Sequence, residues 1–214
     1  MKESILLNNI SKIKEIPLPG AKAHLSMAPY HRFKYIKNYD SFKSKATIAS
    51  VLIFVFENDK NESCFTLIKR TSGIGVHSGQ ISLPGGKKEL TDNSNWDTAI
   101  RESEEEIGIK RKKINFVCEL SPIYIPPSNY FVYPFIGIYS ESPKFKSDPL
   151  EVDRLITVPV KSLIDKSLLV NKKINTTYAK DVRFPAFKFN NEVVWGATAM
   201  ILAEFKFLLK RIDI

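Results

Sequence analysis

Three glutamates near the middle of the chain, Glu102, Glu105 and Glu106, have the spacing of side chains that share one face of a helix. Like charges this close repel, which costs roughly a few tenths of a kcal/mol per pair on a bare helix. A hard divalent cation would offset that repulsion, because Mg²⁺ prefers carboxylate oxygens and substrate phosphates as ligands. The spacing therefore predicts a magnesium site, although a glutamate-rich helix taken alone is more often a solvated surface.

Two neighbouring features strengthen this prediction. Arg101 stands one helical turn before Glu105, so its guanidinium could orient that carboxylate through a charge-assisted hydrogen bond. Ahead of the helix, Pro84-Gly85-Gly86 predicts a tight turn whose backbone can approach an ion or a phosphate closely. A glycine turn followed by a carboxylate helix indicates a compact site for a metal and a phosphate.

The elements that must position these residues follow from hydrophobic spacing. Residues 95–107 carry one apolar stripe, which predicts an amphipathic helix that ends at Gly108. The strongly apolar residues 46–56 predict a buried strand, and residues 64–69 predict its hairpin partner. Residues 71–86 hold five glycines and one proline, which predicts a loop for most of that length.

The rest of the chain is consistent with a single domain over residues 1–214. A short amphipathic helix over residues 3–14 and an irregular, proline-containing arm are expected within residues 1–45. The remaining segments predict an α/β layered domain. Strands are expected at 115–120, 131–139, 155–158, 184–189 and 192–195, a helical turn at 161–165 and a final helix at 197–210.

Composition narrows the class of protein without choosing a function. Charged residues make up 26% of the chain and the net charge is +9, with the lysines scattered rather than gathered into a tract. No apolar run reaches the ~18 residues that a membrane-spanning helix needs. The N-terminus does not have the pattern of a secretory signal, and Cys64 and Cys118 lie in apolar segments typical of buried free thiols. We therefore expect a cytoplasmic protein.

The residues around the glutamates resemble the Nudix box, whose second half reads R-E-apolar-x-E-E-x-G-apolar. Residues 101–109 match it, with Ser103 in place of the usual apolar residue. In the first half, which begins at Gly86, Asp92 takes the place of the early glutamate, and eight residues rather than seven separate it from Arg101. The box thus covers about residues 86–109, and this variant looks like the coenzyme A pyrophosphatase branch of the family.

Upstream residues also resemble that branch. Residues 67–86, LIKRTSGIGVHSGQISLPGG, carry a matching arginine at Arg70 and a His-Ser-Gly-Gln run that begins at His77. Two positions depart from the branch pattern. Gly75 stands where the branch carries an arginine, and Leu83 stands where it carries a phenylalanine. Because an arginine is a natural partner for an anionic phosphate, the first departure bears on substrate choice.

The resemblance implies an α/β/α Nudix sandwich with a mixed sheet and a catalytic site at the box. It implies Mg²⁺, with Mn²⁺ as a substitute, held by Glu102, Glu105, Glu106 and the Gly86 carbonyl. Arg101, Glu105 and Glu106 would be the catalytic residues. Substrate-binding side chains are expected to be Arg70, His77 and Gln80. Glu151 is an additional candidate for a metal ligand or a base, and Tyr124 or Tyr130 is a candidate stacking residue.

Three functions remain open at this stage. The first is hydrolysis of the pyrophosphate bond of coenzyme A or its thioesters, and the second is hydrolysis of ADP-ribose, a dinucleotide or an mRNA cap. The third is a catalytically silent Nudix fold that binds nucleotide or RNA. The expected partner is a small-molecule nucleotide substrate rather than a nucleic acid, and no membrane partner is expected. The assembly is left open, a homodimer included.

Overall fold

The most apolar segment, β1 (Thr47–Glu57), is the central strand of a mixed sheet in the computed structural model, which describes residues 9–73, 76–139, 141–174 and 181–212. β1 pairs in parallel with β7 (Tyr130–Tyr139) and antiparallel with β2 (Ser63–Arg70). The sheet runs in the order β3-β2-β1-β7-β5, with β4, β6 and β8 paired alongside β1, β7 and β2. Its other strands are β3 (Ile81–Ser82), β4 (Gly85–Lys87), β5 (Ile114–Glu119), β6 (Ile123–Ile125) and β8 (Val152–Pro159).

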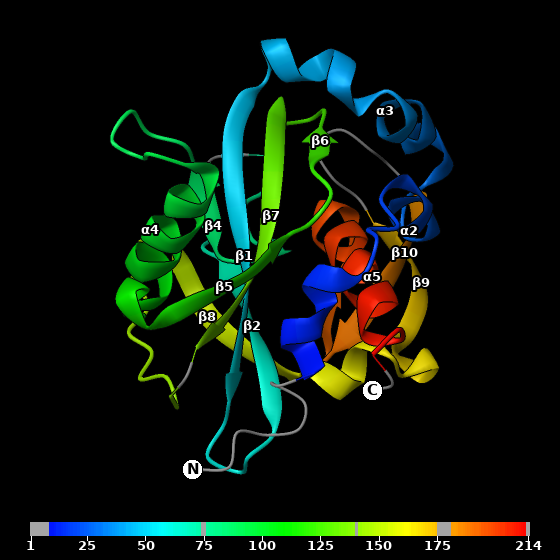
Figure 1. The fold of residues 1–214 in the computed structure, drawn as a ribbon. Helices are drawn as coiled ribbons and strands as arrows, with labels where there is room; N and C mark the ends of the chain where they lie inside the picture. Colours follow the sequence, from blue (N-terminus) through cyan, green and yellow to red (C-terminus); the bar gives the residue numbers. More distant parts are fainter. Residues whose placement is uncertain (1–8, 74–75, 140, 175–180, 213–214) are drawn as a thin grey trace.

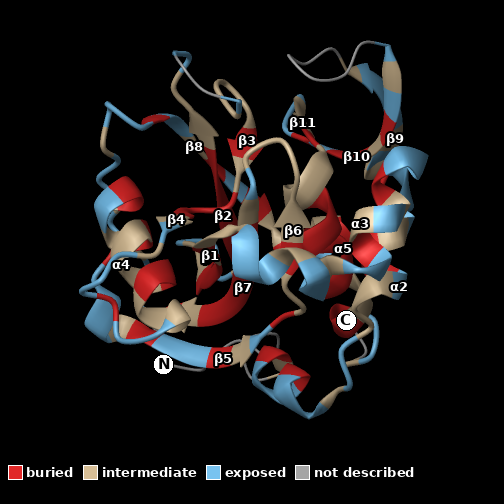
Figure 2. Ribbon diagram, turned by 90° about the horizontal axis from the view of Figure 1, so that it is seen from above, coloured by how far each residue is buried: buried red, intermediate tan, exposed pale blue. Residues whose placement is uncertain are grey.

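Both faces of this sheet are covered, because side chains of β1 alternate between two hydrophobic clusters. Ile53 and Val55 belong to the cluster that contains the C-terminal helix α5 (Gly196–Leu209). Phe54 and Phe56 point the other way, into the cluster that includes residues of α4 (Asn95–Ile107). The two helices lie on opposite sides of the sheet (Figure 1), so the α/β sandwich with a mixed sheet is confirmed. Burial is concentrated where these layers meet (Figure 2).

The helix predicted over residues 95–107 is present with those bounds as α4. Its N-terminus is capped by Ser94, whose hydroxyl accepts a hydrogen bond from the backbone N–H of Asp97 at 3.1 Å. Its C-terminus ends at Gly108, whose φ of 72° is the left-handed conformation expected of a C-terminal cap. The carboxylate helix is therefore fixed at both ends by local sequence.

The N-terminal arm is more ordered than predicted. The irregular chain expected before residue 46 instead holds the helices α2 (Ala21–Ser26) and α3 (Phe33–Lys37), because the turns between its prolines bury apolar side chains such as Met27 and Ile36. Three 3₁₀ turns accompany them, at Ser11–Glu15, Tyr30–Arg32 and Tyr39–Lys45. Of the helix predicted over residues 3–14, the part up to residue 8 lies outside the described residues.

A second, three-stranded sheet leads into α5. It runs in the order β11-β10-β9 and comprises β9 (Leu169–Ile174), β10 (Val182–Phe189) and β11 (Glu192–Val194). The remaining short turns are 3₁₀ helices at Arg111–Lys113, Val160–Leu163 and Lys166–Leu168. The strands β3, β4, β6 and β9 were not predicted. In the described part of the chain, no helix is long and apolar enough to cross a membrane.

Candidate active site

Two of the three carboxylates predicted as metal ligands, Glu102 and Glu106, stand one turn apart on α4 and line a cavity of about 1180 Å³, as does Gly86, the fourth predicted ligand. Glu151, in the loop before β8, lines the same cavity. Glu105 is not among the cavity-lining residues; its carboxylate is 59% exposed and is held by Arg101 at 3.0 Å. The structure thus brings Glu102, Glu106 and Glu151 to one space and leaves Glu105 at its margin.

Glu106 is the most buried carboxylate of this group, with a side chain only 2% exposed. One oxygen, Oε2, accepts a hydrogen bond from the Gly85 N–H at 2.8 Å, and Oε1 accepts one from Arg70 Nη1 at 3.2 Å. Burial nevertheless raises the pKa of Glu106 to about 7, and the charges of Glu102 and Glu151 act in the same direction. Glu106 therefore occupies a site where added positive charge would be strongly favourable.

The glycine turn before α4 allows this close packing. Gly85 and Gly86 are the first two residues of β4, and they pair with Val51 and Ser50 of β1. Gly85 has φ 142°, and a Cβ at this position would overlap the backbone of β1. A Cβ at Gly86 would overlap the carboxylate of Glu102. Gly85 is needed for the backbone to lie directly against β1, whereas a side chain at Gly86 would displace the Glu102 carboxylate.

Arg101 holds the box together rather than lining the cavity. Its guanidinium contacts Glu102 and Glu105, each at 3.0 Å, and donates to the Lys87 carbonyl at 3.0 Å. The contact expected between Arg101 and Glu105 is therefore present. Two effects oppose each other at Glu102. Burial raises the pKa of its carboxylate, whereas the charge of Arg101 lowers it by a smaller amount. The geometry makes Arg101 a positioning residue for the two glutamates.

Asp92, which replaces the early glutamate of the box, is the strongest partner of Arg101. Nε of Arg101 donates to Oδ1 at 2.9 Å and Nη2 donates to Oδ2 at 3.0 Å, a bidentate pair. Asp92 also accepts hydrogen bonds from the Thr98 hydroxyl and the Glu89 N–H. The Arg101 hydrogen bonds hold the pKa of Asp92 far below its usual range. The loop before α4, which is one residue longer than in the usual Nudix box, is therefore fixed to the helix by the contact between Asp92 and Arg101.

Arg70, the last residue of β2, lies between the carboxylates and the loop that follows β2. It contacts Glu106 at 3.2 Å and Glu151 at 4.0 Å, and it lines the cavity while remaining 32% exposed. The neighbouring Thr71 ties the loop to residues before β8, because its N–H donates to the Glu151 carbonyl at 3.0 Å. Arg70 is thus placed between the buried carboxylates and open space, where an anionic group could reach it.

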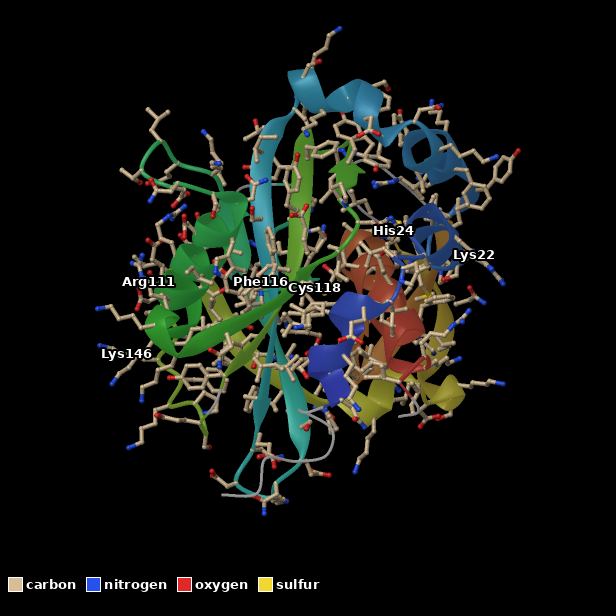
Figure 3. All side chains as sticks on the ribbon, viewed as in Figure 1. Lys22, His24, Arg111, Phe116, Cys118 and Lys146 are labelled. Atoms are coloured by element: carbon tan, nitrogen blue, oxygen red, sulfur yellow. The ribbon has the colours of Figure 1, made fainter. Side chains whose placement is uncertain are left out.

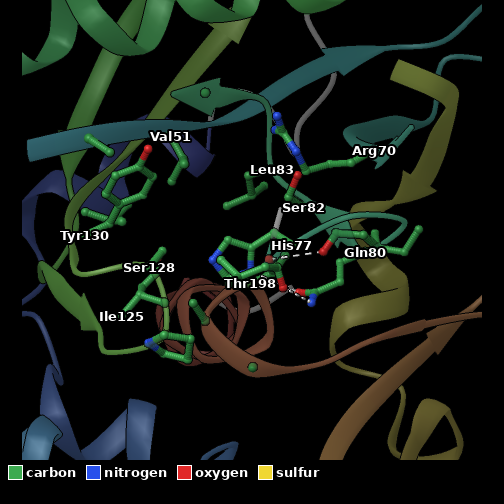
Figure 4. Close-up of a pocket in the computed structure, with 18 of the residues that line it drawn as sticks. Val51, Arg70, His77, Gln80, Ser82, Leu83, Ile125, Ser128, Tyr130 and Thr198 are labelled. Carbon is green, nitrogen blue, oxygen red and sulfur yellow. Dashed lines mark hydrogen bonds between the residues drawn. The ribbon is translucent and has the colours of Figure 1, made fainter. Parts of the chain in front are cut away.

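His77 and Gln80 line the cavity and interact with each other (Figure 4). His77 Nδ1 lies 3.2 Å from Gln80 Oε1, and Gln80 Nε2 donates to the Val76 carbonyl at 3.0 Å. If Nδ1 donates in this pair, neutral His77 presents Nε2 as an acceptor. Burial lowers the pKa of His77, and the charge of Arg70 acts in the same direction. The structure brings both predicted residues to the cavity and leaves their roles as predictions.

The two candidate stacking residues differ in position. Tyr130 lines the cavity opposite His77 (Figure 4). Tyr124 is not among the lining residues; its ring stacks on Phe42, with centroids 4.5 Å apart, and its hydroxyl donates to Asn129. Tyr130 is therefore available to a ligand, whereas Tyr124 supports the fold.

Several lining residues were not found from the sequence. Arg32 and Tyr35 come from the arm, and Phe184 comes from β10 of the second sheet. None belongs to a motif with recognisable spacing. Only the fold brings these distant segments to the Nudix-box residues, so sequence spacing carried no signal for them.

The donor set suits a hard divalent cation. Glu102, Glu106 and Glu151 offer carboxylate oxygens to one cavity, and burial, with smaller contributions from the charges of Glu102 and Glu151, raises the pKa of Glu106. Within the described residues, no three histidine, cysteine or acidic side chains already surround one point, because Arg70, Arg101 and the Gly85 N–H hold the carboxylates. Binding a cation would exchange some of these contacts for coordination.

Comparison with known proteins adds an independent finding. The model of the NUDIX domain family matches residues 46–178. Nudix hydrolase 15, a mitochondrial protein of Arabidopsis thaliana, is 33% identical over 174 residues, which cover 78% of this chain and 59% of the relative. Nudix hydrolase 22, a chloroplastic protein of the same plant, is 34% identical over 72% of this chain and 52% of its own length. The chain thus spans a little over half the length of these two relatives.

Solved structures agree on the fold. A Nudix hydrolase from M. smegmatis, RenU, superposes with a TM-score of 0.54 at 13% identity, covering 79% of this chain and 89% of that one. A MutT/nudix family protein from Enterococcus faecalis gives a TM-score of 0.52 at 13% identity over 86% and 75% of the two chains. At such low identity these matches bear on the fold alone.

Proposed function

The chain belongs to the Nudix family, and from this premise we propose that it is a metal-dependent pyrophosphohydrolase acting on a nucleoside-diphosphate compound. The observation that carries the proposal is the buried Glu106, which shares one cavity with Glu102, Glu151 and Arg70. A divalent cation would offset the mutual repulsion of these carboxylates, and carboxylate oxygens together with substrate phosphates are the ligands that Mg²⁺ prefers. The cavity volume of about 1180 Å³ also suits a substrate larger than a single nucleotide.

In this mechanism the protein supplies positioning and charge. Bound Mg²⁺ would polarise the phosphate and acidify a water molecule. Glu102, Glu106 and Glu151 would hold the cation, with the Gly86 carbonyl beside them. Arg70 would turn from Glu106 toward the diphosphate as coordination replaces its ion pair. Arg101 keeps Glu102 and Glu105 oriented, and Glu105 or Glu106 would accept the water proton.

For the substrate, we propose coenzyme A or a related diphosphate, with ADP-ribose, a dinucleotide and an mRNA cap as the alternatives. His77 and Gln80 support a polar contact with the substrate, because both line the cavity beside Arg70. Gly75, which stands where the coenzyme A branch carries an arginine, lies outside the described residues. Lys87 lines the cavity and could supply part of that missing charge.

The test is a product analysis on the purified chain. Protein and Mg²⁺ are incubated with coenzyme A, ADP-ribose, NADH and capped RNA, and the products are identified by mass. We expect cleavage between two phosphates of at least one compound and no cleavage by Glu106→Gln. Nucleotide binding without turnover of any compound would support the silent Nudix fold instead.

A further inference from the structure

Three polar atoms in the cavity wall lack a hydrogen bond within the described residues. They are Nε2 of His77 and the hydroxyl oxygens of Ser82 and Ser128, and each is shielded from solvent. The three side chains line the cavity (Figure 4) and come from separate segments, which are the loop after β2, β3 and the β6–β7 turn. Buried polar groups in folded proteins are almost always paired, so this unpaired set indicates a place for a polar ligand.

The hydrogen bonds of Gln80 determine which nitrogen of His77 carries the proton. The side-chain Nε2 of Gln80 lies 3.0 Å from the Val76 carbonyl, which can only accept, so the amide nitrogen must face Val76. The amide oxygen Oε1 therefore faces Nδ1 of His77, at 3.2 Å. Because an amide oxygen can only accept, Nδ1 is the protonated nitrogen. In neutral His77 the unpaired Nε2 is then a hydrogen-bond acceptor.

The surroundings of His77 favour this neutral form. Burial lowers its pKa, and the charges of Arg70 and Arg32 act in the same direction, whereas the Gln80 hydrogen bond opposes them. A neutral Nε2 presents a lone pair, which repels phosphate oxygens and attracts an N–H or O–H group. His77 is therefore suited to a donor group of the substrate and not to its anionic part.

Backbone contacts place His77 beside the carboxylate end of the cavity. The Arg70 N–H donates to the Gln80 carbonyl at 3.0 Å, and the Gln80 N–H donates to the His77 carbonyl at 3.2 Å. Ser82 pairs with Ile68, two residues before Arg70. In a nucleoside-diphosphate compound the nucleoside sugar is joined directly to the diphosphate. The first donors beyond the phosphates are therefore hydroxyls of that sugar.

We propose that His77 is a specificity-determining residue that accepts a hydrogen bond from a hydroxyl of the nucleoside sugar. Gln80 is the positioning residue, because it holds the imidazole in the accepting tautomer. The hydroxyls of Ser82 and Ser128 can donate or accept, so they are compatible with the same group. This inference rests on the proposed function, since it takes the diphosphate to lie at the carboxylate end.

The experiment compares nucleotides that differ by one polar group. Calorimetric titration with ADP, 2′-deoxy-ADP, 3′-deoxy-ADP and IDP, with Ca²⁺ as the divalent cation, measures their affinities. We expect one deoxy nucleotide to bind about 10- to 100-fold more weakly than ADP, because it leaves the buried acceptor unpaired, and IDP to bind within about threefold of ADP. His77→Phe should reduce the discrimination against the deoxy nucleotide to within about threefold. His77→Gln, whose amide oxygen can accept, should restore part of it.

The matched control is His31→Phe, which removes the imidazole of another cavity-lining residue, one that is exposed and packs against Phe184. It should keep the full discrimination. Equal binding of ADP and both deoxy nucleotides by the wild-type chain, or an unchanged ratio in His77→Phe, would overturn the inference. A preference for ADP over IDP that disappears in His77→Phe would assign the contact to the base and reject the sugar contact.

The tautomer of His77 has its own spectroscopic signature. Nitrogen-15 chemical shifts distinguish a protonated from a bare imidazole nitrogen. The chain has three histidines, so comparison with His77→Phe identifies the signals of His77. We expect a protonated Nδ1 and a bare Nε2 in the wild-type chain at neutral pH. Gln80→Leu should give a mixture of tautomers and lower the discrimination several-fold. A protonated Nε2 in the wild-type chain would reject the inference.

These measurements separate the inference from the proposed function, because binding requires no turnover. If no compound is hydrolysed while ADP is still preferred through His77, the proposed function fails and the His77 contact holds. Hydrolysis by a chain that does not discriminate between ADP and its deoxy analogues would leave the proposed function in place and remove the contact.

Discussion

At the scale of single residues, the local environment separates glutamates that look equivalent in the sequence. Glu104, Glu105 and Glu106 are consecutive, yet Glu106 is buried in the cavity wall, Glu105 is turned toward Arg101, and Glu104 pairs with Arg111 at 2.6 Å. Only Glu106 combines burial with a pKa raised to about 7. Its charge is therefore the costliest of the three for the fold to maintain, and the one that a cation would stabilise most.

We expect Glu106→Gln to lower kcat by more than about 100-fold under saturating Mg²⁺ while the variant remains folded. The amide keeps the shape of the side chain but removes a charge from the proposed metal site. Steady-state kinetics and a thermal melt measure the two effects. Glu104→Gln, which removes a carboxylate from the outer side of the same helical turn, is the matched control and should keep its activity. Near wild-type turnover by Glu106→Gln would show that this residue is not a metal ligand.

At the scale of elements, prediction from the sequence succeeded where local signals agree. The helix over residues 95–107 was predicted to its ends from its apolar stripe and Gly108, and the Ser94 cap seen in the structure agrees with them. β4 was missed because Gly85-Gly86-Lys87 has no strand pattern and is a strand only through its register with β1. The arm helices were missed for a similar reason, since they are one or two turns long and depend on burial against α5.

The same distinction holds for the site. The carboxylates of the box could be found from the sequence because they are separated by helical spacing. Arg32 could not, because a single arginine in a basic arm has no pattern that relates it to Glu106. The two positions are brought to one cavity only by the packing of the arm against β6 and α5.

The loop before α4 yields a prediction about stability and pH. Asp92→Asn breaks the buried bidentate pair with Arg101, which should cost about 2–3 kcal/mol at neutral pH and lower Tm by roughly 5–10 °C. Because the pKa of Asp92 is lowered in the folded state, its stabilisation is fully present above its unfolded pKa of about 3.9 and is lost progressively as the pH falls from there toward the lower folded-state pKa. The stability gap between the two proteins should therefore shrink as pH falls below about 4.

Urea unfolding of both proteins between pH 3 and pH 8 measures this gap. Asp153→Asn is the control, because Asp153 is a largely exposed carboxylate whose contact with Lys69 is 3.9 Å long. It should change stability by less than about 0.5 kcal/mol at any pH in that range. A gap for Asp92→Asn that stays constant down to pH 3 would show that the pair does not stabilise the fold through its charge.

At the scale of the whole molecule, activity should depend on a divalent cation that joins α4 to the loop of Glu151. We expect hydrolysis to stop after exhaustive chelation and dialysis and to return when Mg²⁺ or Mn²⁺ is added. Metal-free protein should remain folded by circular dichroism, because both core clusters are apolar and lie on the two faces of the sheet. Full activity in chelator would exclude the metal-dependent mechanism as a whole.

The arm, the β5–β6 turn and α5 meet at the buried carboxylate of Glu204. This α5 residue is fully buried and accepts hydrogen bonds from the Gly20 N–H at 3.0 Å and from the Ser121 N–H and hydroxyl at 2.9 and 2.7 Å. Nε2 of His24, a residue of α2 in the arm, lies 3.4 Å from Oε2 of Glu204 (Figure 3). Burial would raise the pKa of Glu204, but its contacts with His24 and Ser121 outweigh that effect and lower it. Glu204 therefore ties the arm and the β5–β6 turn to the C-terminal helix.

We expect Glu204→Gln to loosen the arm, because the amide has one acceptor oxygen where the carboxylate had two, and it places an NH₂ group among N–H donors. The cost should be about 2–4 kcal/mol. Since the arm supplies Arg32 and Tyr35 to the cavity wall, KM should rise several-fold, whereas kcat should change by less than about threefold because the carboxylates on α4 are untouched.

Hydrogen exchange should accelerate over α2 and α3 and stay unchanged over α4. The surface substitution Glu141→Gln, which removes a carboxylate paired with Lys113, should alter neither measurement. Faster exchange in α4, or a fall in kcat with KM unchanged, would mean that Glu204 supports the catalytic helix itself rather than the arm.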